Sequence, residues 1–160
     1  INTGHADDDN AVDRVIAGYG ELVAVGEQAG VRLLIENHGG ISATAEGVTQ
    51  ILDGVKSDWF GTCPDSANFA PEHWQTGMQS LMPRAFSCHV KVFSLDEEGR
   101  QDWEDREGNK RGFGMIQFFE LLKESGYSGP LCVEKSVTEN AREGIADTLD
   151  YVRAMMEKAA

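Results

Sequence analysis

Apolar side chains recur at intervals of three and four residues in several segments of the chain, which is the pattern of amphipathic helices. Over 10–29 this spacing predicts a helix that ends at Gly30. Further helices are expected over 42–55, with Ser42 as N-cap, and after Thr138, which can cap the last one. Two more are expected over 72–82 and 113–125. In the last helix the side chains expected to face inward are Ile145, Leu149, Val152 and Met156.

Short apolar runs separate these helices. The segments 31–36, 58–62, 85–92 and 130–134 are predicted strands, and 1–3 is the expected tail of another. Continuous apolar runs are typical of strands that are buried on both faces, as in a parallel sheet. Strands that alternate with helices predict an α/β fold built of βα units. The segment 95–112 is rich in charge and glycine and is expected to be a long loop over the strand ends.

Polar residues stand at the carboxyl ends of the predicted strands. They are Glu36, Asp65, His89 and Glu134, one for each strand. In α/β folds this end of the strands carries the chemistry. Taken singly, each has a simpler explanation, such as a surface charge, a turn-forming aspartate or a structural histidine. Together, three carboxylates and an imidazole suit one divalent cation such as Mn²⁺, Mg²⁺, Co²⁺ or Zn²⁺.

Two further residues lie close to this set in the sequence. Side chains alternate along a strand, so Lys91 shares a face with His89. The alternative for Lys91 is a surface ion pair with Asp96, Glu97 or Glu98. His38 shares a face with Glu36 if the strand continues that far, where it would contact substrate. It is equally well placed to cap the turn at 39–40.

Composition limits the classes of protein. The chain has 160 residues, enough for one domain, and a formal net charge of −13, which opposes binding to nucleic acid. It has no apolar run as long as a membrane span and no visible signal peptide, so we expect a cytoplasmic protein. Its three cysteines match no zinc spacing and are expected to be small, buried, reduced thiols.

Four motifs together resemble a known superfamily. They are Ile35-Glu36-Asn37-His38-Gly39-Gly40, Asp65-Ser66-Ala67-Asn68-Phe69, His89-Val90-Lys91, and the run from Gly126 to Glu134 with the sequence GYSGPLCVE. They resemble the sugar phosphate isomerase/epimerase superfamily, the xylose isomerase-like TIM barrels. The resemblance implies that residues 1–160 form a single, partial domain. This domain would be the C-terminal half of a (β/α)₈ barrel, from about strand four to the last helix.

The resemblance also implies roles for these residues. Glu36, Asp65, His89 and Glu134 would hold one divalent metal ion, and the two glutamates would move protons at the substrate carbon. Asn68 matches a position that contacts substrate, and Lys91 matches an H-x-K position, although an aspartate that often follows is replaced by Val92. The implied function is isomerisation or epimerisation of a sugar or sugar phosphate through a metal-stabilised enediolate. Lys91 or His38 would stabilise the developing oxyanion.

Several alternatives stay open at this point. Dehydratases and hydroxypyruvate isomerases share the architecture, and a truncated member could be a non-catalytic remnant that binds metal or sugar. Apurinic endonucleases resemble the chain less, because Asn68 stands where they carry a further histidine ligand. A plain α/β interaction domain would leave the four strand-end residues far apart. A typical barrel needs about 250 residues, so we expect either a homo-oligomer or a complementing N-terminal half.

Overall fold

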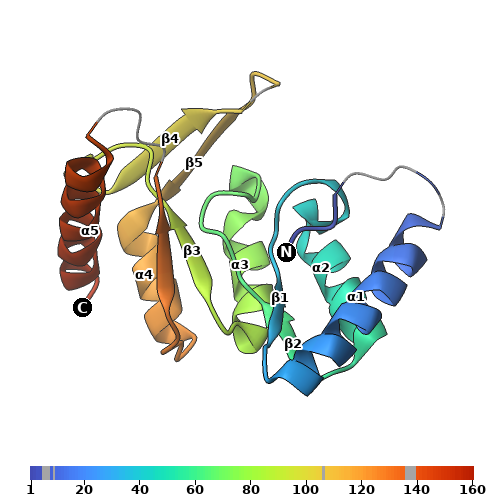
Figure 1. Ribbon diagram of the computed structural model, residues 1–160. Helices are drawn as coiled ribbons and strands as arrows, with labels where there is room; N and C mark the ends of the chain where they lie inside the picture. The colour runs from blue at the N-terminus through green and yellow to red at the C-terminus, as the bar shows by residue number, and fades with distance from the viewer. Residues whose placement is uncertain (5–7, 9, 106, 136–139) are drawn as a thin grey trace.

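Helices alternate with short strands along the chain, as the sequence predicts (Figure 1). The computed structural model describes residues 1–4, 8, 10–105, 107–135 and 140–160. The helices are α1 (Ala11–Ala29), α2 (Ala45–Val55), α3 (Trp74–Leu81), α4 (Met115–Glu124) and α5 (Ala141–Lys158). The strands are β1 (Leu33–Ile35), β2 (Phe60–Thr62), β3 (Cys88–Lys91), β4 (Arg100–Glu104), β5 (Lys110–Gly114) and β6 (Leu131–Glu134). Short 3₁₀ turns cover Gly40–Ala43, Pro71–His73 and Met82–Arg84.

Four of the strands run parallel in the order β1, β2, β3, β6. β1 pairs with β2 and β3 pairs with β6, while single bridges from Thr62 to Ala85 and from Asp65 to His89 join the two pairs. Ile1 lies beside β1, because its amino group donates to the Leu34 carbonyl at 2.8 Å and its carbonyl accepts from the Glu36 amide at 3.1 Å. The carboxyl ends of all four strands therefore lie at one edge, where the candidate ligands were expected.

α1 packs against β1 and α2 packs against β2, whereas α3 packs against α2 and α5 packs against α4. α1 ends at Gly30, whose φ of 68° supplies the left-handed conformation of a C-cap, as predicted. The expected cap of α2 is wrong. Thr44 caps α2 by accepting a hydrogen bond from the Gly47 amide, because its backbone is extended as an N-cap requires. Ser42 lies two residues earlier, where its hydroxyl group accepts from the His38 amide and donates to the Gly39 carbonyl.

The segment 95–112 is not a long loop. It contains an antiparallel hairpin of β4 and β5, which projects from one end of the parallel strands (Figure 1). β4 alternates exposed side chains with the buried Gln101 and the half-buried Trp103, a two-residue period that its high charge obscures. Gln101 accepts from the Phe93 amide at 2.8 Å and donates to the Ser94 carbonyl at 3.0 Å, so the hairpin fixes the chain after β3.

The inward face of α5 differs from the predicted one. Thr148, Val152 and Met155 are buried, whereas Ile145, Leu149 and Met156 are exposed by 36%, 36% and 43%. The helix is rotated toward the unforeseen hairpin, where the Tyr151 hydroxyl accepts from Gln101 at 2.8 Å. Thr138, the predicted cap, lies outside the described residues, and α5 begins after Asn140.

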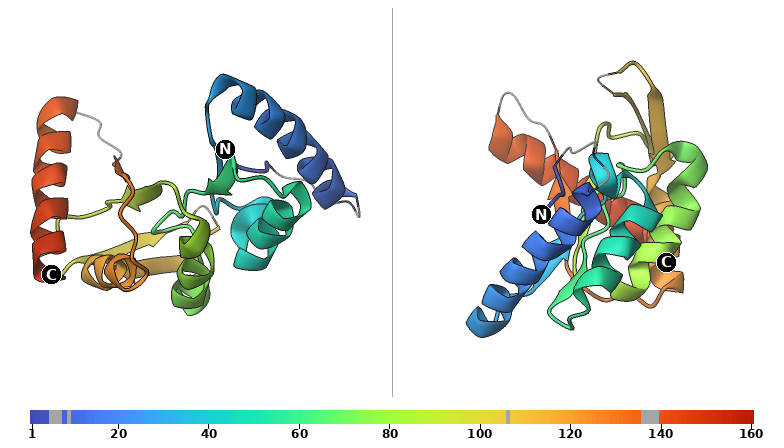
Figure 2. Two further views of the ribbon diagram at one scale, coloured as in Figure 1. Left: turned by 90° about the horizontal axis from the view of Figure 1, so that it is seen from below. Right: turned by 90° about the vertical axis from the view of Figure 1, so that its right-hand side faces the viewer.

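α1 and α5 lie at opposite ends of the row of elements, and the other helices lie between them (Figures 1 and 2). In the described part of the chain, no helix combines the length and the apolar character needed to cross a membrane. All three cysteines are free thiols, as predicted. Cys63 and Cys88 are buried, but Cys132 is exposed, so the expectation of burial is wrong for that residue.

Candidate metal centre

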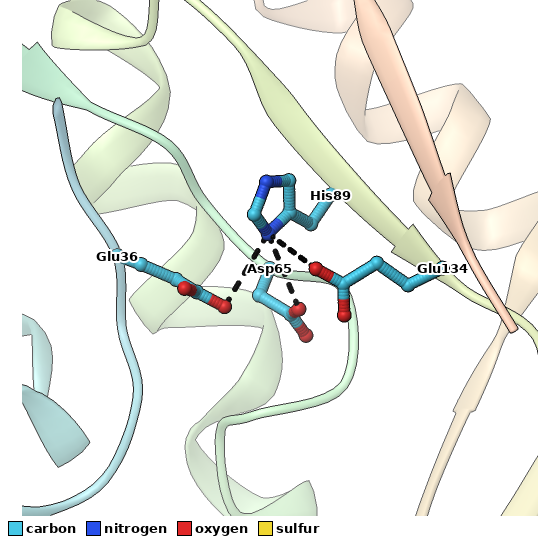
Figure 3. A group of neighbouring side chains, drawn as sticks. All are labelled: Glu36, Asp65, His89 and Glu134. Carbon is cyan, nitrogen blue, oxygen red and sulfur yellow. Dashed lines mark hydrogen bonds and ion pairs between the residues drawn. The ribbon is translucent and has the colours of Figure 1, made fainter. Parts of the chain in front are cut away.

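The four candidate ligands converge at the carboxyl ends of the parallel strands. Glu36 directly follows β1, Asp65 lies in the turn after β2, His89 belongs to β3, and Glu134 is the last residue of β6. Their side chains point toward one another (Figure 3), and one donor atom from each lies within 4.8 Å of the others. This convergence contradicts the interpretation as a plain interaction domain, which requires these residues to be spread apart.

The His89 ring lies at the centre of the group. Its Nδ1 atom is 2.9 Å from Glu134 Oε1, 3.4 Å from Glu36 Oε1 and 3.9 Å from Asp65 Oδ2. Asp65 is fully buried, Glu36 is 13% exposed and Glu134 is 40% exposed. The site is therefore closed on the side of Asp65 and open on the side of Glu134.

Lys91 faces the same group, as strand alternation predicts. Its Nζ atom lies 2.6 Å from Asp65 Oδ2, 3.3 Å from Glu134 Oε2 and 4.0 Å from Glu36 Oε1. It also donates to Asn68 Oδ1 at 3.1 Å. The alternative of a surface ion pair with the acidic residues at 96–98 is wrong, because the strand directs Lys91 to the inner face.

The turn that carries Asp65 is held by residues that the sequence analysis did not assign to the site. The buried Asn37 accepts from the Asp65 amide at 2.7 Å and donates to its carbonyl at 3.2 Å. Asp65 accepts from the Ala67 amide at 2.8 Å, which closes a local turn. Trp74 donates its indole N–H to the Ser66 carbonyl at 2.7 Å. The sequence signal for this role was the amide residue Asn37, which stands between Glu36 and His38 in the first motif.

The electrostatics of the cluster follow from burial and crowding. Burial raises the pKa of Asp65 to about 6, although the Lys91 ammonium acts in the opposite direction. Burial also raises the pKa of Glu36, but His89 and Lys91 outweigh it and lower that pKa overall. The pKa of His89 is raised to about 11, first by the Cys63 side chain and then by Glu36. His89 and Lys91 thus place two positive charges among the three carboxylates.

This donor set fits a divalent cation. Two atoms bound to one ion at about 2.1 Å lie between about 3 Å and about 4.2 Å apart, so donor atoms that lie within 4.8 Å of one another need side-chain adjustments on the order of 1 Å to bind one ion. Carboxylate oxygens and an imidazole nitrogen are accepted by Mn²⁺, Mg²⁺, Co²⁺ and Zn²⁺. Because a ligating imidazole nitrogen must be unprotonated, binding would release the proton that His89 carries.

Two residues expected to contact substrate have different surroundings. Asn68 lies beside the cluster and donates to Glu36 Oε1 at 3.2 Å. His38 is exposed, and β1 ends at Ile35, so strand alternation does not extend to it. Its backbone amide donates to Ser42 Oγ at 3.2 Å, which places His38 in the turn.

Comparison with known proteins identifies sugar epimerases among the relatives. The chain is 29% identical over 110 residues to an L-ribulose-5-phosphate 3-epimerase from Salmonella paratyphi A. The match covers 66% of this chain and 37% of that relative, so the chain spans well under half of the relative's length.

Solved structures share the fold at lower identity. A xylose isomerase-like TIM barrel protein from Mycobacterium smegmatis, solved with magnesium, matches 98% of this chain and 54% of its own length, with a TM-score of 0.69 and 19% identity. An L-ribulose 3-epimerase matches 98% of this chain and 57% of its own length, with a TM-score of 0.70 and 18% identity. These likenesses establish the TIM-barrel type of fold.

The family model described as xylose isomerase-like TIM barrel matches residues 2–155, which is nearly the whole chain. The resemblance of the four motifs is thereby confirmed over the elements that carry the four strand-end residues. The chain belongs to the xylose isomerase-like TIM barrel family.

Proposed function

We propose that the chain is the metal-binding part of a divalent-metal-dependent isomerase or epimerase that acts on a sugar or sugar phosphate. The observation that carries this proposal is the convergence of Glu36, Asp65, His89 and Glu134 at the strand ends. The relatives that are named as sugar epimerases support the substrate class. We infer a small-molecule substrate, and a cytoplasmic location stays a prediction.

The four residues would hold one ion, which is Mn²⁺, Mg²⁺, Co²⁺ or Zn²⁺. Bound there, a divalent ion would polarise the sugar carbonyl and stabilise the enediolate charge that develops when the adjacent carbon loses its proton. Asp65 is buried and tied to Lys91, so its role is to hold the ion rather than to move protons. His89 supplies the nitrogen donor at the centre of the group.

Glu36 and Glu134 are the groups that we assign to proton transfer. They come from the first and last of the four parallel strands and reach the site from opposite sides (Figure 3). One carboxylate can take a proton from one face of the substrate carbon, and the other can return one to the opposite face. That exchange inverts the centre, which is an epimerisation. Transfer between neighbouring carbons would give aldose–ketose isomerisation.

Lys91, Asn68 and His38 complete the proposed site. The Lys91 ammonium stands beside three carboxylates and would stabilise negative charge that develops on a substrate oxygen. Asn68 borders both Glu36 and a cavity of about 470 Å³ between α2 and α3, so its amide is placed to contact substrate. His38 lies on the exposed turn after β1, where it would meet substrate from the solvent side.

We also propose that the four parallel strands form the C-terminal half of a (β/α)₈ barrel. The chain covers only 54% and 57% of the two solved structures. Exposed apolar side chains lie on α1 and α5, at the two ends of the row. A complementing N-terminal half or a second copy of the chain would cover these ends.

The incomplete coverage supports a second candidate. The match spans 37% of the curated relative. A non-catalytic chain that binds metal or sugar would have these features. A dehydratase or a hydroxypyruvate isomerase would use the same ligands on another substrate.

Deuterium exchange in heavy water tests the proposal. The Mn²⁺-loaded chain is incubated with L-ribulose 5-phosphate or L-ribulose, and the hydrogen on carbon 3 is followed by NMR. Proton removal by a carboxylate predicts incorporation of solvent deuterium, even if turnover is slow. Glu36→Gln and Glu134→Gln should each abolish it, whereas Glu124→Gln, on the C-terminal turn of α4, should not.

Metal binding without deuterium incorporation into either sugar would contradict 3-epimerisation of these sugars and favour the non-catalytic candidate. Incorporation that persists in both Glu36→Gln and Glu134→Gln would contradict the assignment of these two carboxylates.

A further inference from the structure

A second cavity of about 450 Å³ opens at the carboxyl ends of β3 and β6. Glu134 belongs to both the ligand cluster and the wall of this cavity, and Lys91, whose Nζ atom lies 3.3 Å from Glu134 Oε2, also lines the wall. Phe93, Val133 and Ile145 supply apolar walls. Sites for small ligands usually occupy about 300–1,000 Å³, so the space is large enough for one end of a sugar derivative. A substrate held at the cluster would extend into it.

Lys135 brings a positive charge to this cavity. It is the first residue after β6 and is half-buried, and its Nζ atom donates to the Phe93 carbonyl at 3.5 Å, which is a long hydrogen bond. Within the described ranges, no carboxylate oxygen lies within 4.0 Å of this ammonium group. The Phe93 carbonyl is held in place because Gln101 fixes the neighbouring backbone.

The positive charge of Lys135 is not needed to neutralise the ligand carboxylates. The three ligand carboxylates would be neutralised by a divalent ion together with Lys91, which lies 2.6 Å from Asp65. Among the described residues that line this cavity, Lys135 is then the positive charge that remains without a carboxylate partner, in a chain whose net charge is −13. An ammonium group of this kind attracts phosphate as a point charge and gives charge-assisted hydrogen bonds.

The cavity between α2 and α3 is less suited to an anion. Its guanidinium group, on Arg111, is already paired with Asp105 at 3.0 Å, and Glu46 adds a negative charge to the wall. The relatives include proteins named for both kinds of substrate, since one is named for a phosphorylated sugar and another for a free one.

We propose that Lys135 binds the phosphate group of the substrate in the cavity beside Glu134, so that the chain prefers a sugar phosphate to the free sugar. This inference rests on the proposed function, since it needs the sugar to be held at the ligand cluster. Lys135 is a specificity residue in this account and takes no part in proton transfer.

Calorimetric titration of the Mn²⁺-loaded chain tests the inference with a matched pair of ligands. L-Ribulose 5-phosphate should bind at least about tenfold more tightly than L-ribulose, because it adds a charge-assisted contact. Lys135→Met should remove this difference and leave the affinity for L-ribulose unchanged. Lys135→Arg should keep most of it. Lys56→Met, at the end of α2 and the opposite end of the strands, should behave like the natural chain.

The outcomes separate this inference from the proposed function. Binding of Mn²⁺ and of L-ribulose without any advantage for the phosphorylated sugar overturns the role of Lys135 alone. An advantage that survives in Lys135→Met also overturns it. Failure to bind Mn²⁺ overturns the proposed function itself. Inorganic phosphate, titrated alone, should bind weakly to the natural chain and not detectably to Lys135→Met; equal binding to both would place the phosphate elsewhere and contradict the inference.

Discussion

At the scale of single residues, the site depends on a few buried polar groups that hold the ligands in position. Asn37 shows this most clearly, because it is fully buried and both atoms of its amide bond to the backbone of Asp65. Among the residues that the structure describes, the only strand partner of the turn at Asp65 is the bridge to His89. The Asn37 side chain therefore holds the backbone from which the Asp65 carboxylate projects.

Asn37→Ala should lower the free energy of unfolding by about 1–3 kcal/mol, because it leaves the Asp65 amide and carbonyl without partners in a buried place. Urea denaturation measures this change. Asn10→Ala is a matched control, since Asn10 is exposed and makes no side-chain cap bond to α1. It should change stability by less than about 0.5 kcal/mol. Equal losses in the two variants would show that the Asn37 amide does not support the turn.

At the scale of elements, the β4–β5 hairpin is the main feature that the sequence did not reveal. Its connection is organised by Asp105, which accepts hydrogen bonds from the amides of Glu107 and Asn109 and from the Arg111 side chain. These bonds, with the Asn109 amide first, lower the pKa of Asp105 to about 2. The carboxylate form of Asp105 is thus the form that the folded hairpin favours.

The lowered pKa of Asp105 sets the direction in which the stability of the hairpin changes with pH. A carboxyl group with a lowered pKa in the folded state stabilises that state above its ordinary pKa, near 3.8, and this contribution is lost as the pH falls toward 2. NMR should therefore show that the Asn109 amide signal, which reports on its hydrogen bond to Asp105, has its main transition near pH 2. Asp105→Asn should remove that transition, and Asp102→Asn should not. A transition centred near pH 4 in the natural chain would contradict this role of Asp105.

The elements also show how far the sequence determines the structure. Periodicity located α1, α2 and the four parallel strands, because apolar spacing and Gly30 are local signals. The hairpin was not predicted because the side chains on the buried face of β4 include polar residues such as Gln101. The burial of Gln101 depends on partners that are distant in sequence. Because the hairpin was not predicted, the inward face of α5 was predicted wrongly as well. The convergence of the four candidate ligands could be predicted because each predicted strand ends in one of them, whereas Lys135 gave no sequence signal, since its cavity arises only when β3 and β6 pair.

At the scale of the whole molecule, apolar side chains remain exposed at both ends of the row of elements. Leu22 and Val25 on α1 are exposed by 49% and 65%, and Met156 on α5 by 43%. Several large exposed apolar residues on one helix face indicate a surface that another chain covers. The site itself lies between these ends, where all four parallel strands contribute to it.

The isolated chain should therefore associate with a second copy. Light scattering should give a molar mass above that of the 17.5 kDa monomer. Leu149→Glu should shift the chain toward the monomer, because a charge on the exposed face of α5 opposes burial of that face. Glu157→Gln, an exposed and polar position on the same helix, should leave the mass unchanged. A natural chain that is monodisperse as a monomer and melts cooperatively would contradict this expectation.

Four side chains from four strand ends are proposed to hold one metal ion. The most direct measurement is the divalent metal content after dialysis against Mn²⁺ and removal of the free ion, for the natural chain, Glu134→Gln and the control Glu143→Gln on the first turn of α5. We predict about one ion per chain in the natural protein and in Glu143→Gln, and little in Glu134→Gln, because one ligand is lost. A folded natural chain without metal, or equal content in all three, would contradict the account.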